Sequence, residues 1–219
     1  MPDLGYTEGV ERLPKGVSMR TKDRFSTLLL SLVLVTVSCS IEPSASIEQG
    51  SSAATGSDAT QTETARIVRT LRDWDTGLRP AEIEHLAGVI TIEAQRAKLP
   101  PTLVLAVIEV ESGGRNFAVS HVGARGLMQL LPTTGAFVAE AADLPWRGPE
   151  TLFDPVANVR LGVRYLERLV ERYPDLRTAL AAYNWGPNHI SRRLRQGEAL
   201  PRQYADRVMS AWSGAVREI

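Results

Sequence analysis

Apolar residues recur at alternating three- and four-residue steps over residues 156–173, and this period constrains the fold more than any other feature of the sequence. The stripe consists of Val156, Val159, Val163, Leu166, Val170 and Tyr173. Such a period places the apolar side chains on one face of an α-helix, and that face must be covered by other elements. Asp154 before Pro155 favours a helix start, with the aspartate as N-cap and the proline in the first turn.

Helical patterns cover most of the chain after residue 65, and little of it alternates with the period of a strand. Besides the helix that begins at residue 155, we expect helices over 67–74, over 80–97, from 101, from 132, after Asp175 as far as 183, and over 204–216. The connections between them are short. The sequence therefore predicts a compact all-α domain over residues 65–219.

The first 64 residues have the composition of an export signal followed by a tether. Basic residues after Met19 precede an apolar stretch over 25–37, which is shorter than the roughly 20 residues of a transmembrane helix. The stretch stops at Cys39, the only cysteine, so an internal disulfide and a cysteine-based metal site are excluded. We expect a signal peptide over 1–39. Residues 40–64 are rich in Ser, Ala, Thr and Gln, which predicts a disordered, flexible linker.

A signal that stops at a lone cysteine resembles a bacterial lipoprotein signal, in which that cysteine becomes the acylated N-terminus. Thr36 stands where the motif of that family has Leu, Val or Ile, so an ordinary signal with an incidental cysteine is the alternative. The resemblance implies lipidation at Cys39 and a membrane anchor. Ser40 resembles the residue that directs sorting to the outer membrane, so we expect a periplasmic protein anchored there.

Glu111 follows the apolar segment 103–110 and precedes Gly113 and Gly114, which favour the end of a helix. The partial negative charge of a helix C-terminus and an apolar environment both raise the pKa of a carboxyl group. A raised pKa suits a general acid near neutral pH, although a solvated glutamate at a helix end is the plain alternative. Glu109 points about 200° away on the same helix, so the two glutamates do not form a pair.

Two further segments combine small, polar and aromatic residues. Residues 120–130 are rich in small residues, which let a backbone approach a ligand closely, although Leu-Met-Gln-Leu at the end of the segment is equally suited to a core. Residues 181–187 place Tyr183, Asn184 and Trp185 together at a predicted helix end. Rings and amides of this kind suit a sugar site.

The order of these segments resembles that of the soluble-lytic-transglycosylase family, relatives of goose-type lysozyme. The resemblance covers roughly residues 90–195 and implies a lysozyme-like all-α fold. It is carried by Glu111-Ser112, Ser120, Gly123-Ala124, Gly126 to Gln129, Asp154-Pro155, Asn158, Gly162, Tyr165-Leu166, Ala182 to Asn184 and Gly186-Pro187. Trp185 departs from the small residue that is usual in the last motif.

The resemblance, which extends to small membrane-bound lytic murein transglycosylases, implies cleavage of peptidoglycan glycan strands. Family members cut the β-1,4 bond between N-acetylmuramic acid and N-acetylglucosamine and leave a 1,6-anhydro sugar. Glu111 matches the catalytic acid/base. The implied substrate-binding residues are Ser120, which orients the acetamido group, Met128 and Gln129 in the cleft wall, and Tyr183 and Asn184 on the side opposite the glutamate.

The matched motifs contain one carboxyl group for catalysis, whereas ordinary glycosidases use two. This favours a mechanism in which the acetamido group of the substrate assists. A hydrolysing lysozyme or chitinase and a non-catalytic peptidoglycan-binding protein are the alternatives. The three histidines lack the spacing of metal ligands, so we expect no metal and no cofactor. A formal net charge of zero gives no support for nucleic acid binding, and we expect a monomer.

Overall fold

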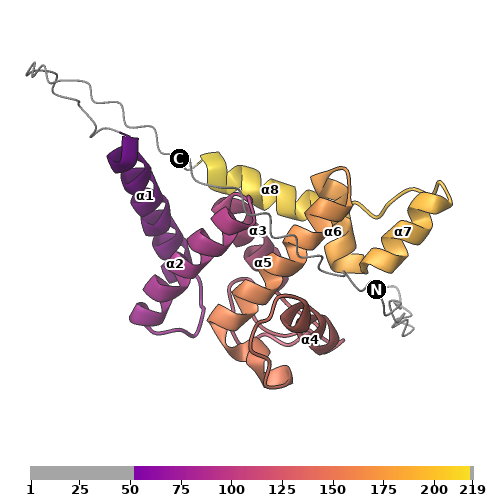
Figure 1. Ribbon diagram of the computed structural model, residues 1–219, viewed down its shortest axis with the longest axis horizontal. Helices are drawn as coiled ribbons and strands as arrows, with labels where there is room; N and C mark the ends of the chain where they lie inside the picture. The colour runs from indigo at the N-terminus through magenta and orange to yellow at the C-terminus, as the bar shows by residue number, and fades with distance from the viewer. Residues whose placement is uncertain (1–51, 218–219) are drawn as a thin grey trace, which may run out of the picture. The chain divides into compact units, whose positions relative to one another are not determined.

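The computed structural model describes residues 52–217, with side chains described over 60–214, and these residues lie in one compact unit. Within residues 52–217 the chain forms eight α-helices, one 3-10 helix and no strand (Figure 1). The all-α prediction is confirmed. In this part of the chain no helix combines the length and hydropathy that a membrane crossing requires. The predicted signal peptide and Cys39 lie outside the described residues.

The helices are α1 (Ser52–Asp73), α2 (Pro80–Arg96), α3 (Pro101–Ser112), α4 (Pro132–Ala141), η1 (Pro149–Phe153), α5 (Pro155–Arg172), α6 (Leu176–Trp185), α7 (Pro187–Arg195) and α8 (Gln203–Arg217). The carboxylates of Asp154 and Asp175 cap α5 and α6 as predicted, because each accepts a hydrogen bond from a backbone N–H in the first turn. The short helices η1 and α7 were not expected. Each buries only one side chain, so neither has an apolar period to reveal it.

The helix α1 begins at Ser52, so the prediction of a flexible linker up to residue 64 is wrong for the part of it that the structure describes. Residues 40–51 lie outside the described chain. Ile67 and Leu71 are fully buried, α1 packs on α2, and the hydroxyls of Thr64 and Thr91 are 3.1 Å apart. This packing stabilises a helix that a sequence rich in Ser and Thr does not favour by itself.

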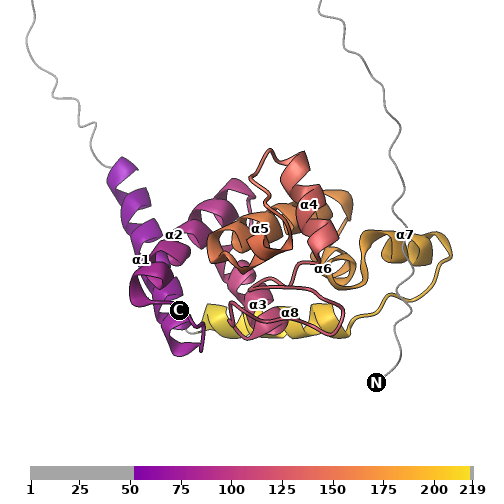
Figure 2. The ribbon, with the colours of Figure 1, turned by 90° about the horizontal axis from the view of Figure 1, so that it is seen from below.

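The helix α3 is enclosed on nearly all sides, because every residue over 103–108 is buried. It packs along α8 and against α2, and α5 packs on α2 and α6. Figures 1 and 2 show α3 beside α8, with α1 and α2 at one end of the domain and α7 beyond α6 at the other. The predicted stripe on α5 faces this core, since Val159, Val163 and Leu166 are fully buried. Helix α3 is therefore held between α8 and α2.

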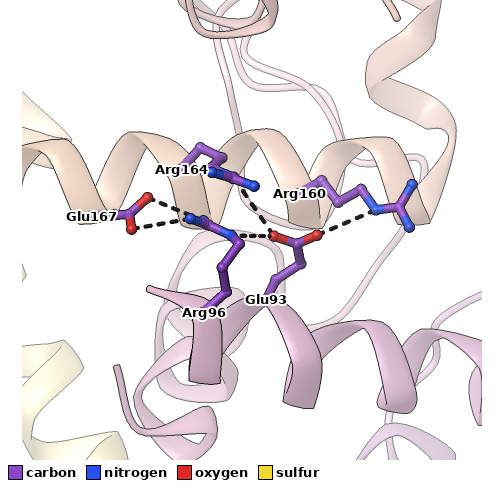
Figure 3. Close-up of polar contacts among 5 residues, drawn as sticks. All are labelled: Glu93, Arg96, Arg160, Arg164 and Glu167. Carbon is purple, nitrogen blue, oxygen red and sulfur yellow. Dashed lines mark hydrogen bonds and ion pairs between the residues drawn. The ribbon is translucent and has the colours of Figure 1, made fainter. Parts of the chain in front are cut away.

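A cluster of charged side chains joins α2 to α5 (Figure 3). Glu93 accepts a hydrogen bond of 2.9 Å from Arg96 and forms ion pairs with Arg160 at 3.4 Å and Arg164 at 3.7 Å. Arg96 also donates two hydrogen bonds, of 3.1 and 3.0 Å, to the carboxylate of Glu167. The Glu93 side chain is only 12% exposed, so these three cations must compensate the cost of removing its carboxylate from water.

The substitution Glu93→Gln is expected to lower the free energy of unfolding by about 2 kcal/mol, because three guanidinium groups then lose their shared anion. Urea unfolding monitored by circular dichroism measures the change. The control is Glu84→Gln, which removes an ion pair with Arg72 whose side chains are 51% and 60% exposed. Such an exposed pair contributes about 0.5 kcal/mol. Equal losses in the two variants would contradict the prediction.

Candidate active site

Glu111 is the penultimate residue of α3, which ends where Gly113 adopts a left-handed φ of 60°, as the sequence predicted. Its carboxyl Oε1 accepts a hydrogen bond of 2.6 Å from the hydroxyl of Tyr204 on α8. Burial raises the pKa of Glu111 to about 7, and this outweighs the hydrogen bond from Tyr204 and the charge of Arg207, which both lower it. The expected upward shift of the pKa has its cause in the loss of water around the carboxyl. A carboxyl with this pKa can give and take a proton near neutral pH.

A row of three tyrosines from three helices leads to the carboxyl of Glu111 at the end of α3. The Tyr183 ring on α6 lies 6.4 Å from the Tyr204 ring and nearly parallel to it, and 5.3 Å from the ring of Tyr165 on α5. Burial, and then the charge of Glu111, raises the pKa of both Tyr183 and Tyr204 well above the ordinary value. Both phenols therefore stay protonated and act as hydrogen-bond donors.

The segment between α3 and α4 is tied to the end of α3 and to α5. The Ser112 hydroxyl bonds to the carbonyl of Leu127 at 2.8 Å. Asn158 on α5 is fully buried and accepts from the Met128 N–H at 2.8 Å. Its amide nitrogen also donates to the carbonyls of Arg125 and Leu152, at 3.0 and 2.8 Å. A loop with so many fixed backbone groups can hold substrate-facing atoms in place without a regular strand.

Met128 and Gln129 point to the interior of this segment. Met128 is fully buried, and its sulfur lies where a Cβ on Gly162 would come within 2.3 Å, so the side chain packs in the core. The Gln129 side-chain amide donates to the carbonyls of Ala118 and Gly126, at 3.0 and 2.9 Å. Both side chains thus brace the segment from within, because its own turns leave these positions facing inward.

The structure brings Tyr183 close to Glu111 and leaves Ser120 and Asn184 at the surface. The Tyr183 hydroxyl donates to the carbonyl of Met128 at 2.8 Å, so it holds the loop while its ring flanks Tyr204. Ser120 is partly exposed in the turn over 120–124, and its hydroxyl accepts from the Ala124 N–H at 3.0 Å. Asn184 is exposed at the end of α6. Within the described residues, no hydrogen bond joins Ser120 or Asn184 to Glu111.

Sequence reasoning missed Tyr204, the residue that bonds directly to Glu111. The sequence pattern places Tyr204 only at the start of the last amphipathic helix. It is 93 residues away from Glu111 along the chain, so no local pattern connects the two. The available signal was a tyrosine as the first apolar-face residue of α8, a position that is only 2% exposed. A phenol buried at a helix start needs a partner for its hydroxyl.

Two other features of the described residues do not form part of this site. A cavity of about 400 Å³ between α6 and the segment that leads into α8 is lined by Thr178, Ala181, Leu200 and Ala205, among others. Neither Glu111 nor any predicted site residue lines it. In the described part of the chain, no group of three or more His, Cys, Asp or Glu side chains is placed to hold a metal ion.

Replacing Glu111 by glutamine is expected to raise the free energy of unfolding at pH 8 by about 2 kcal/mol. The folded-state pKa of about 7 lies above the usual value of 4.5, so the folded protein binds more protons between these values. Stability is therefore lost as the pH rises through 7, and a neutral amide avoids this loss. Below pH 4.5 the carboxyl is protonated in both states and the gain should vanish. Urea unfolding of both proteins from pH 4 to 8 measures it; a gain independent of pH would contradict it.

Comparison with known proteins places this site in a wider group. A family model described as the transglycosylase SLT domain matches residues 88–205, which is more than half of the chain. A transglycosylase of Enterobacteria phage PRD1 is 39% identical over 103 residues, which make up 46% of this chain and 36% of that protein. Membrane-bound lytic murein transglycosylase F of Vibrio cholerae is 37% identical over 114 residues, 48% of this chain and 20% of that protein.

A solved structure shares the fold. The X-ray structure of an inactive mutant of the lytic transglycosylase Slt from Pseudomonas aeruginosa matches with a TM-score of 0.54 and 28% sequence identity. The match covers 59% of this chain and 24% of that one. This chain therefore spans about a third or less of the length of each protein compared. Residues 88–205, which the family model matches, include Glu111, Tyr183 and Tyr204.

Proposed function

The chain belongs to the transglycosylase SLT domain family, and from this we propose that it is a lytic transglycosylase that cleaves peptidoglycan glycan strands. The bond cleaved is the β-1,4 bond between N-acetylmuramic acid and N-acetylglucosamine. The observation that carries the proposal is the carboxyl of Glu111, which has a pKa of about 7 and a phenol donor 2.6 Å away. The relative from Vibrio cholerae, which is named a lytic murein transglycosylase, supports this choice of substrate.

The surroundings of Glu111 support a mechanism with one carboxyl group. The pKa of Glu111 is shifted by burial, by the phenol of Tyr204 and by the guanidinium of Arg207. In the described chain, no second carboxyl group is among the causes of this shift. In the proposed reaction Glu111 protonates the glycosidic oxygen, and the N-acetylglucosamine side leaves with that proton. The acetamido group of the muramic acid residue stabilises the positive charge that develops at C1.

The second step closes the anhydro ring and restores the enzyme. The C6 hydroxyl of the muramic acid residue attacks C1, and the ionised Glu111 takes the hydroxyl proton. A new C6–O–C1 bond replaces the glycosidic bond, so no water is consumed. The carboxyl ends in the protonated form in which it began. A pKa near 7 suits both steps because neither protonation state is strongly favoured at neutral pH.

The masses of the products test the proposal. Purified sacculi are digested with the protein, and the released muropeptides are analysed by mass spectrometry. Products with 1,6-anhydro ends are lighter by one water than the products of hydrolysis. The proposal expects anhydro ends. Products that carry the extra water would show a lysozyme-like or chitinase-like hydrolase, and binding to sacculi without any release would show a non-catalytic peptidoglycan-binding protein.

We also propose a location in the cell envelope, where peptidoglycan lies. The relative from Vibrio cholerae is named as membrane-bound, which supports this location. Attachment through a lipid on Cys39, in the periplasm and at the outer membrane, remains part of the proposal. Labelling of cells with radioactive palmitate tests it: the protein should take up label, and the variant Cys39→Ser should not. Label in neither protein would rule out the lipid anchor.

A further inference from the structure

Arg207 lies one turn after Tyr204 on α8, on the same side of the helix. Its guanidinium carbon is 5.9 Å from the centre of the Tyr204 ring, a distance at which a cation is attracted to the face of a phenol. Tyr204 donates the hydrogen bond of 2.6 Å to Glu111. The Arg207 guanidinium thus contacts the Tyr204 ring, and the Tyr204 hydroxyl contacts the Glu111 carboxyl. The charge of Arg207 also acts on Glu111 directly.

The charge of Arg207 is not taken up by an ion pair. Neighbouring arginines have carboxylate partners: Arg177 pairs with Asp206, and Arg193 pairs with Glu198 at 3.2 Å. In the part of the chain that the structure describes, no carboxylate lies within ion-pair distance of Arg207, whose side chain is exposed. Its guanidinium can therefore act on the Tyr204 ring and on Glu111 without competition from a nearer anion.

We propose that Arg207 is a positioning residue, which holds the Tyr204 ring in place for its hydrogen bond to Glu111 and balances the charge of that carboxylate. This inference rests on the proposed function, because it takes Glu111 as the group that gives and regains a proton. Burial favours the protonated carboxyl that breaks the glycosidic bond. Arg207 and the Tyr204 hydroxyl favour the ionised carboxyl that accepts the proton of the C6 hydroxyl.

Two other titratable groups interact with Glu111, and both are phenols. Tyr204 comes from α8 and Tyr183 from α6, and Tyr165 on α5 acts on Tyr183. Burial keeps Tyr183 and Tyr204 protonated, and Glu109 on α3 itself points to the opposite side of its helix. Arg207 thus supplies the positive charge that acts on Glu111. Its removal should make the ionised form of Glu111 less stable relative to the protonated form.

The pH profile of kcat/KM on sacculi tests the proposal. Activity falls at high pH as Glu111 loses its proton, so in Arg207→Gln the alkaline limb should move to higher pH, by about half a unit for an exposed cation. Arg207→Lys keeps the charge and should keep the limb in place. Arg195→Gln on α7 removes an exposed arginine elsewhere and should also leave it unmoved. A folded, active Arg207→Gln protein with an unmoved limb would overturn the proposal.

A second measurement does not depend on turnover. In protein with 13C-labelled glutamate, the carboxyl signal of Glu111 is assigned by its absence in Glu111→Gln and then titrated without substrate. The midpoint should be higher in Arg207→Gln than in the unchanged protein, and this difference should shrink at high salt. Equal midpoints would overturn the role of Arg207. A protein without substitutions that releases no muropeptides, together with a higher midpoint in Arg207→Gln, would contradict the proposed function and leave the role of Arg207 standing.

Discussion

Glutamine in place of Glu111 should lower the turnover of peptidoglycan by about a thousandfold. The amide has nearly the same shape as the carboxyl and can still accept the hydrogen bond of 2.6 Å from Tyr204. It cannot deliver a proton to the glycosidic oxygen or take one from the C6 hydroxyl, so both steps of the proposed reaction lose their acid/base. Release of soluble muropeptides from sacculi measures turnover, and circular dichroism confirms that the helices remain.

Glu109→Gln is the matched control for this experiment. It removes a carboxyl from the same helix two residues earlier, where the side chain is exposed and points away from the site. This variant should keep its full turnover. A Glu111→Gln protein that is equally active would show that another group supplies the proton. An inactive Glu109→Gln protein would show that loss of activity on α3 does not identify the acid.

An alanine at Gly126 should lower the free energy of unfolding by about 3 kcal/mol or more and abolish activity. Gly126 has a φ of +76°, and a Cβ there would lie 2.2 Å from both the Asn158 amide nitrogen and the Leu152 carbonyl oxygen. These atoms belong to the contacts that tie the loop to α5. The loop must therefore move away, and the backbone that carries Leu127 and Met128 moves with it.

Gly123 provides a control with the same backbone strain and no crowding. Its φ is +81°, and no atom lies within 4 Å of a Cβ built there. Gly123→Ala should therefore lose only about 1 kcal/mol, the cost of a left-handed conformation for alanine. Thermal unfolding and muropeptide release are measured for both variants. If the two variants lose similar amounts of stability and activity, the close approach of Gly126 to α5 contributes little to fixing the loop.

Most of the fold could be predicted from local patterns in the sequence. The period of apolar residues identified α5, and the aspartates before α5 and α6 predicted their caps, because these signals depend on neighbours within one or two turns. The end of α3 and the raised pKa of Glu111 followed from an apolar run that stops at two glycines. The helical conformation of residues 52–64 did not follow, because their composition does not favour a helix by itself; they continue a helix whose later residues Ile67 and Leu71 pack in the core.

What the sequence determined by itself is most of the helices, the caps of α5 and α6, and a carboxyl placed at the end of the buried helix α3. Only the tertiary structure decided which group meets that carboxyl. α8 packs along α3 and brings the hydroxyl of Tyr204 to Glu111, across 93 residues of chain. Tertiary contacts also decided where Met128 packs, since its sulfur lies against Gly162 of α5, whereas the Gln129 amide bonds to Ala118 and Gly126 of its own loop. Such pairings depend on how separate faces fit together, and no period along the chain records that fit.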